Sequence, residues 1–153
     1  MNLERLHRPT GPMPEAVHKL FGGIDLTGLE MLRLVRITSN LYEVATDEQL
    51  EAAGLSGPRW RLLLRLHREE VGGDAGGMSP THLSRCQNVS KNTISALLRG
   101  LEEQGLVERT LDPEDKRAFR IRLSEAGRQM VITTAPRHLA YLNELANALE
   151  PAP

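Results

Sequence analysis

Polar side chains with hydrogen-bonding or cationic groups gather in residues 90–99 of this chain. They are Ser90, Lys91, Asn92, Thr93, Ser95 and Arg99. Asn can bond two edge atoms of adenine and Arg two of guanine, a hydroxyl suits either base, and a cation can pair with phosphate. Three apolar residues in and directly after this stretch, Ile94, Leu97 and Leu101, have helical spacing, so the polar set would lie off the buried stripe of one helix. The solvated face of an ordinary surface helix looks the same, and residue types alone leave both interpretations open.

A second charged cluster, Asp115, Lys116 and Arg117, lies between two alternating stretches at 106–111 and 119–123. An Arg at the end of a hairpin can enter a narrow minor groove, where the negative potential of DNA is concentrated. Asp115 would then orient Arg117 and read no base. A charged turn is also common on the hairpins of soluble proteins, so the residue types alone leave open whether this cluster binds DNA.

The elements that must position these residues can be predicted from caps and breaks. Ser79 followed by Pro80 begins a short helix, residues 87–89 interrupt it, and Ser90 caps a longer helix that ends at Gly105. Two helices joined by a short turn form the outline of a helix-turn-helix. The alternating stretches after it predict a β-hairpin, which in this position is a wing.

The remaining helices are predicted from apolar spacing. A helix beginning near Asp25 carries two apolar stripes, more than a surface helix of a monomer needs, which favours packing against two bodies. One stripe consists of Leu34, Ile37, Leu41, Val44 and Ala45, and the other of Met31, Val35 and Tyr42. The next helix, after Ser56, is predicted to turn four residues inward: Trp60, Leu63, Leu64 and His67. After this helix, the glycines of residues 72–77 indicate a loop. A last helix is predicted to begin at Ser124.

We therefore expect a mainly α fold with a small β-hairpin wing, a winged helix-turn-helix whose N- and C-terminal helices form a dimerisation region. The expected organisation has four segments: an N-terminal arm at 1–24, a dimerisation helix at 25–55, a winged helix-turn-helix DNA-binding domain at 56–123, and C-terminal dimerisation helices at 124–153. The same apolar stripes could instead pack within one chain.

Composition narrows the class of protein. The 153 residues fit about one domain, and 3% aromatic residues exclude a stacking surface for single strands. The net charge is −1, but residues 82–122 carry eight basic and six acidic side chains, a local charge of +2. The single cysteine excludes an intramolecular disulfide and a multi-Cys zinc site. We expect no enzyme activity, metal or cofactor, because no nucleophile elbow, P-loop or dinucleotide fingerprint is present. Without an apolar leader or a stretch of roughly 18 apolar residues, we expect a cytoplasmic protein without membrane contact.

Several motifs together resemble the MarR (multiple antibiotic resistance regulator) family over roughly residues 26–149. They are Leu55-Ser56-x-x-Arg59-Trp60-Arg61, Leu83-Ser84, Val89-Ser90-Lys91-Asn92-Thr93-Ile94-Ser95, Leu101-Glu102-Glu103-Gln104-Gly105-Leu106-Val107-Glu108-Arg109, Asp112-Pro113-Glu114-Asp115-Lys116-Arg117-Ala118 and Leu123-Ser124-Glu125-Ala126-Gly127-Arg128. The resemblance implies a homodimeric winged-helix transcriptional regulator. Its first and last helices would build the dimer interface.

For the candidate site, the resemblance implies the DNA-reading interpretation of both clusters. The helix at 90–99 would enter the major groove and Arg117 the minor groove of double-stranded DNA. A homodimer would read a palindromic operator, more often as a repressor than as an activator. The alternative is a winged-helix protein–protein interaction module without DNA binding. A polar wing that ends in Arg disfavours this alternative, because such a module would more often expose an apolar patch there.

The resemblance also implies a small anionic or phenolic effector between the dimer helices and the DNA-binding lobe. Arg36, Asn40, Trp60 and His67 are candidates for lining such a cleft and for releasing DNA on binding. Plainer roles compete with this one: Trp60 as core filler, His67 as a half-buried helix residue and Arg36 as a surface charge.

Overall fold

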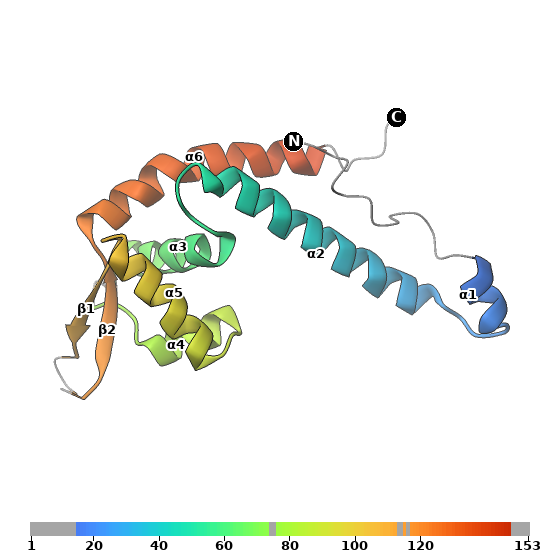
Figure 1. Ribbon diagram of the computed structural model, residues 1–153, viewed down its shortest axis with the longest axis horizontal. Helices are drawn as coiled ribbons and strands as arrows, with labels where there is room; N and C mark the ends of the chain where they lie inside the picture. The colour runs from blue at the N-terminus through green and yellow to red at the C-terminus, as the bar shows by residue number, and fades with distance from the viewer. Residues whose placement is uncertain (1–14, 74–75, 113–114, 116, 148–153) are drawn as a thin grey trace. The chain divides into compact units, whose positions relative to one another are not determined.

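A computed structural model describes residues 15–73, 76–112, 115 and 117–147. It is mainly helical with one antiparallel hairpin, as predicted (Figure 1). The elements in chain order are α1 (Glu15–Leu20), α2 (Thr27–Glu51), α3 (Gly57–Val71), α4 (Pro80–Gln87), α5 (Lys91–Glu103), β1 (Val107–Leu111), β2 (Phe119–Leu123) and α6 (Glu125–Asn147). No helix in these ranges is both long and apolar enough to cross a bilayer.

The chain divides into two compact units, residues 1–46 and 47–153, with the boundary inside α2. The first unit consists, in its described part, of α1 and α2 up to Thr46. Large apolar side chains along this part of α2 are more than 45% exposed. They are Leu29, Met31, Leu32, Leu34, Val35 and Val44. Both predicted stripes of this helix therefore present apolar side chains to solvent.

The second unit contains the hydrophobic core, which is aliphatic apart from Trp60, in keeping with the low aromatic content. Helix α3 is central to it and contacts α4, α5, α6 and β2. Because α3 is enclosed on several sides, its buried face is wider than the predicted stripe. Leu62 and Leu66 are fully buried, whereas Leu64 is 37% exposed, so the prediction that Leu64 turns inward is wrong.

The turn between α4 and α5 is tight because each side of it is capped. Asn88 ends α4 in the left-handed conformation (φ 52°, ψ 44°), which Asn tolerates better than most residues. The Ser84 hydroxyl donates to the carbonyl of Val89 at 2.7 Å. The Ser90 Oγ then accepts from the backbone N–H of Thr93 at 3.1 Å, as the sequence predicted for a cap. These bonds give the helix-turn-helix.

The hairpin pairs β1 with β2 in antiparallel register, from Val107 opposite Leu123 to Leu111 opposite Phe119. Ile121 and Leu123 are buried, as their alternation predicts, and an isolated bridge pairs Ile121 with Met78. Phe119 is 42% exposed because it lies toward the free end of the hairpin, away from the core. The guanidinium carbon of Arg109 lies 5.4 Å from the centre of the Phe119 ring.

Helix α6 begins against the end of α5. The Ser124 hydroxyl donates to the carbonyl of Gly105 at 2.6 Å and accepts from the backbone N–H of Gly127 at 3.0 Å. A Cβ at Gly127 would lie 2.0 Å from the carbonyl oxygen of Leu106, so this contact requires glycine. At the next residue, Arg128 donates from Nε and Nη2 to the two carboxylate oxygens of Glu70 at 3.0 and 3.1 Å. The Ser-x-x-Gly-Arg motif thus joins α6 to α5 and α3.

Candidate nucleic-acid interface

Helix α5 presents one buried and one exposed face, as its pattern predicts. Ile94, Leu98 and Leu101 are fully buried in the core of the second unit, and Leu97 is half-buried. The predicted polar residues of this helix and its cap are all exposed. They are Ser90, Lys91, Asn92, Thr93, Ser95 and Arg99. The core contacts therefore fix which face of α5 meets solvent.

The exposed side chains of α5 divide into two groups by their hydrogen bonds. The hydroxyls are used locally: Ser90 Oγ lies 2.8 Å from Thr93 Oγ1, and Ser95 donates to the carbonyl of Lys91 at 2.9 Å. Lys91, Asn92 and Arg99 make no side-chain hydrogen bond or ion pair to the described part of the chain. These three side chains are therefore available to a ligand.

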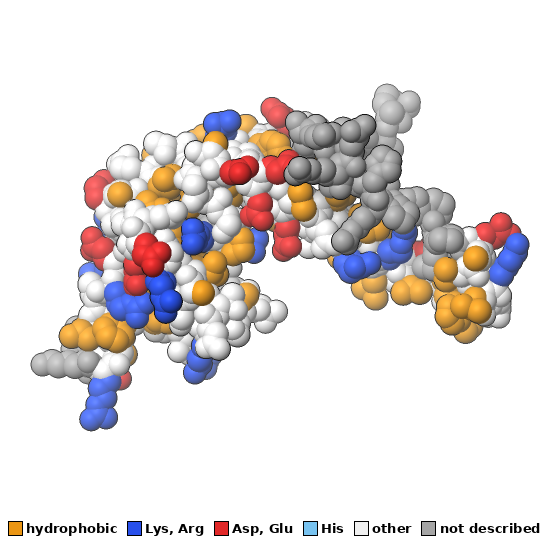
Figure 2. All heavy atoms as spheres, in the orientation of Figure 1, with side chains coloured by type: hydrophobic (Ala, Val, Ile, Leu, Met, Phe, Trp, Pro, Cys, Tyr) orange, Lys and Arg blue, Asp and Glu red, His pale blue; other side chains and the backbone are white. Residues whose placement is uncertain are grey.

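The electrostatics at the start of α5 suit an anion. The first turn has no acidic residue, and the N-terminal N–H groups of a helix carry partial positive charge. At the far end of the helix, Glu102 is paired with Arg109 of β1 at 2.8 Å. Figure 2 shows Lys and Arg side chains projecting from the end of the wing and from the edge of the lobe near α4 and α5.

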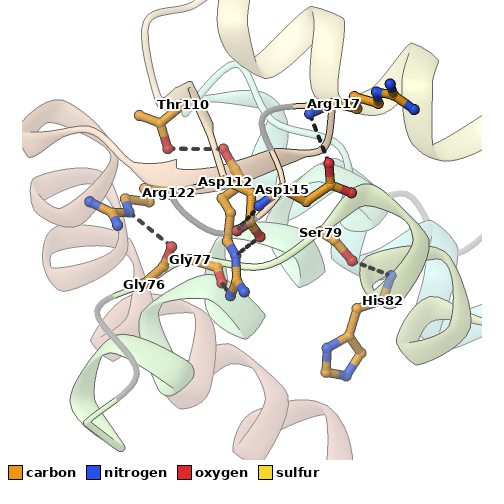
Figure 3. Close-up of polar contacts among 10 residues, drawn as sticks. Gly76, Gly77, Ser79, His82, Thr110, Asp112, Asp115, Arg117 and Arg122 are labelled. Carbon is orange, nitrogen blue, oxygen red and sulfur yellow. Dashed lines mark hydrogen bonds and ion pairs between the residues drawn. The ribbon is translucent and has the colours of Figure 1, made fainter.

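The wing ends in an exposed Arg117 whose backbone is held by Asp115. The Asp115 Oδ1 accepts from the backbone N–H of Arg117 at 2.9 Å, while the Arg117 guanidinium points away from the hairpin (Figure 3). That guanidinium has no partner among the described residues. The predicted link between Asp115 and Arg117 is thus present through the backbone. Lys116, the third predicted residue of this cluster, lies outside the described residues.

Two further arginines of β2 point toward the segment that follows α3. Arg120 Nε donates to Asp112 Oδ2 at 2.7 Å and Nη1 to the carbonyl of Gly77 at 3.1 Å. Arg122 Nε donates to the carbonyl of Gly76 at 3.0 Å. The structure thus uses Nε and Nη1 of Arg120 and Nε of Arg122 as donors within the chain. The opposite charges of Asp112 and Arg120 near the two ends of the turn are the only signal that could have predicted this pair.

The four candidate effector residues fall in different units. Arg36 and Asn40 are exposed on α2 in the first unit, and Trp60 and His67 lie on α3 in the second. Trp60 is 1% exposed in the core, where its ring meets His138 edge-on with centroids 5.6 Å apart. His67 is half-buried and lines a pocket of about 610 Å³ beside the end of α4, which Trp60 does not line. Within the second unit, Trp60 and His67 therefore do not line one pocket.

A family model described as MarR family matches residues 53–118. The chain is 31% identical over 129 residues to the HTH-type transcriptional repressor YetL of Bacillus subtilis (strain 168), covering 80% of this chain and 71% of YetL. It is 28% identical over 123 residues to the transcriptional activatory protein BadR of Rhodopseudomonas palustris, covering 80% of this chain and 68% of BadR. The structure resembles that of the S. aureus MepR–DNA complex with a TM-score of 0.67 and 23% identity, covering 77% and 83% of the two chains. The chain belongs to the MarR family of transcriptional regulators.

Proposed function

We propose that this protein binds double-stranded DNA sequence-specifically as a homodimer, with α5 in the major groove and Arg117 in the adjacent minor groove. One observation carries the proposal: Lys91, Asn92 and Arg99 are exposed and unpaired on a helix whose first turn has no acid, in the same unit as the unpaired guanidinium of Arg117. Cationic and amide groups in this arrangement suit phosphates and base edges. The relation to the DNA-bound MepR supports the proposal.

The homodimer accounts for the exposed apolar side chains of α2. Large apolar patches on a soluble protein often mark an interface with another chain. In this proposal, residues 25–55 and 124–153 form the dimerisation region and residues 56–123 the DNA-binding domain. A two-fold dimer reads a palindrome, with half-sites about 34–36 Å apart.

The proposed regulatory role is that of a cytoplasmic repressor. YetL is named a repressor and BadR an activatory protein, so relatives of both kinds exist, and the more similar of these two is the repressor. We further propose that a small anionic or phenolic effector releases the DNA. Its candidate contact in the second unit is His67, which lines the pocket beside the end of α4, whereas Trp60 is buried in the core.

Selection from a random pool of DNA duplexes, at two salt concentrations, tests the DNA-binding function. We expect an enriched inverted repeat whose affinity falls steeply as the salt concentration rises, because phosphate contacts release counterions. A folded dimer that enriches no duplex at either salt would contradict the proposal and favour a protein partner for the winged helix.

The wing is tested on the selected duplex by Arg117→Ala. We expect binding to weaken about tenfold and the salt dependence to fall by about one ion, because one groove contact is lost. The matched control is Arg68→Ala, which removes the same charge from an exposed position on α3. Sedimentation should show a dimer for both variants. Equal affinities for the two variants would exclude a DNA contact by Arg117.

A further inference from the structure

The end of the glycine-rich stretch lies directly against the wing. The carbonyl oxygens of Gly76 and Gly77 accept the bonds from Arg122 and Arg120 described above. Met78 continues the contact, since its N–H and C=O bond the C=O and N–H of Ile121 at 3.0 and 2.8 Å. A segment that sequence alone leaves without a role is therefore the third partner of the two-stranded hairpin.

Gly77 could not be replaced at this contact without a shift of the backbone. Its φ of +81° is a conformation that glycine favours. A Cβ there would lie 2.6 Å from both the Ile121 carbonyl oxygen and the Arg122 Cγ. The close approach of this segment to β2 thus depends on glycine at position 77.

From Gly77, a series of hydrogen bonds reaches the end of the wing (Figure 3). Arg120 bridges Gly77 and the Oδ2 of Asp112. The other oxygen of Asp112 accepts from the backbone N–H of Asp115 at 3.3 Å, and Asp115 in turn holds the backbone of Arg117. The Asp112 side chain is only 12% exposed, which strengthens its bonds compared with a fully solvated carboxylate.

We propose that this series of contacts, from Gly77 through Arg120 and Asp112 to Asp115, fixes Arg117 in the position from which it enters DNA. We call it the wing anchor. Asp112 and Arg120 are then positioning residues, and neither touches DNA. A two-stranded hairpin is marginally stable on its own, so an attachment to the lobe is what gives its end a defined direction. The inference rests on the proposed function.

The direction in which one substitution changes DNA affinity distinguishes this positioning role from simple electrostatics. Asp112→Ala removes a negative charge from the wing and takes the carboxylate partner from Arg120, so electrostatics alone predicts tighter binding. If the wing anchor positions Arg117, the same substitution weakens binding. Arg120→Lys is the second variant: it keeps the charge that a phosphate contact needs, but it lacks the planar fork that spans Asp112 and Gly77.

The test is a double-mutant cycle on the selected duplex, with each substitution made alone and together with Arg117→Ala. We expect Asp112→Ala and Arg120→Lys each to weaken binding about fivefold in the unsubstituted chain and less than about twofold beside Arg117→Ala, because coupled residues are not additive. Unchanged or tighter binding by Asp112→Ala, or equal weakening in both backgrounds, would overturn the proposal.

Amide hydrogen exchange in the free dimer provides a readout that needs no DNA. Exchange at Asp115 and Arg117 should become faster in Asp112→Ala while the amides of α5 keep their rates. Unchanged rates at Asp115 and Arg117 would also overturn the proposal. If the unsubstituted protein binds no duplex, the proposed function has failed, and the exchange rates still decide whether the wing anchor exists.

Discussion

At the scale of single residues, His138 combines burial with a titratable ring. It is 3% exposed, its Nδ1 lies 2.8 Å from Gln49 Oε1, and its ring packs edge-on against Trp60. Burial lowers the pKa of His138 because the charged imidazolium loses its hydration. The folded chain therefore prefers this histidine neutral.

This preference predicts a loss of stability in mild acid. As the pH falls through the ordinary histidine pKa of about 6.5, the unfolded chain takes up the proton before the folded chain does, and the free energy of unfolding decreases. The decrease ends at the lower folded-state pKa, below which both states are protonated. We expect His138→Gln to reduce this pH dependence, measured as urea midpoints between pH 5 and pH 8. His82→Gln, at an exposed position, is the control, and an equal pH response of the two variants would contradict the prediction.

The sequence predicts interactions between residues close together in the chain better than interactions between residues that only the fold brings together. The cap by Ser90 and the exposure of Lys91 and Asn92 depend only on the surrounding turn of helix, so their pattern is visible in the chain. The pair of Asp112 and Arg120 depends on hairpin register and on the arrival of a distant segment. Spacing alone does not encode either of these.

At the scale of elements, the start of α6 is the joint between the wing and the last helix. Ser124 bonds the carbonyl of Gly105, and Gly127 lies directly against Leu106. The packing of α6 on the lobe therefore depends on a backbone-to-backbone contact that no side chain can enter.

Gly127→Ala should destabilise the second unit. The added Cβ would lie 2.0 Å from the Leu106 carbonyl oxygen, so α6 must shift, at a cost of about 2–3 kcal/mol. Urea unfolding measures this change. Gly28→Ala is the matched control, because its Cβ would meet nothing within 4 Å, and it should leave stability nearly unchanged or raise it slightly. Equal unfolding midpoints would contradict the prediction and show that α6 can shift to accommodate the added Cβ without loss of stability.

The types of the elements follow from the sequence, whereas their buried faces follow only in part. Prolines and serines mark the helix starts and Gly105 marks an end, which is why the helix-turn-helix and the hairpin could be predicted. Leu64 and Phe119 have the apolar character of core residues yet are exposed. Their exposure is decided by how far the neighbouring elements extend, which periodicity does not report.

At the scale of the whole molecule, the unburied apolar residues of α2 are the main departure from an ordinary soluble surface. Met31, Leu32 and Val35 are each more than 60% exposed in the single chain. The periodicity of the sequence predicts two apolar stripes here, whereas only the family resemblance implies a dimer interface over them. The proposed dimer supplies the missing cover.

Val35→Lys should weaken the dimer. A lysine in an apolar interface must be desolvated or must push the chains apart, so we expect dimer dissociation to rise about tenfold or more. Glu43→Lys introduces the same side chain at an exposed position off both stripes and should leave the dimer intact. Sedimentation at several protein concentrations distinguishes the two variants. A dimer equally stable in both would place the interface elsewhere.

The contact between Gly77 and Arg120 also bears on the order in which the chain folds. These residues are 43 positions apart, and the chain between them contains α4, α5 and most of the hairpin. Both the helix pair and the hairpin are made from local contacts that close quickly, whereas joining the ends of so long a segment costs more entropy. We therefore expect the wing to attach to the lobe late in folding, after the helix-turn-helix has formed. A newly made chain would then have α5 in place before the direction of its wing is fixed.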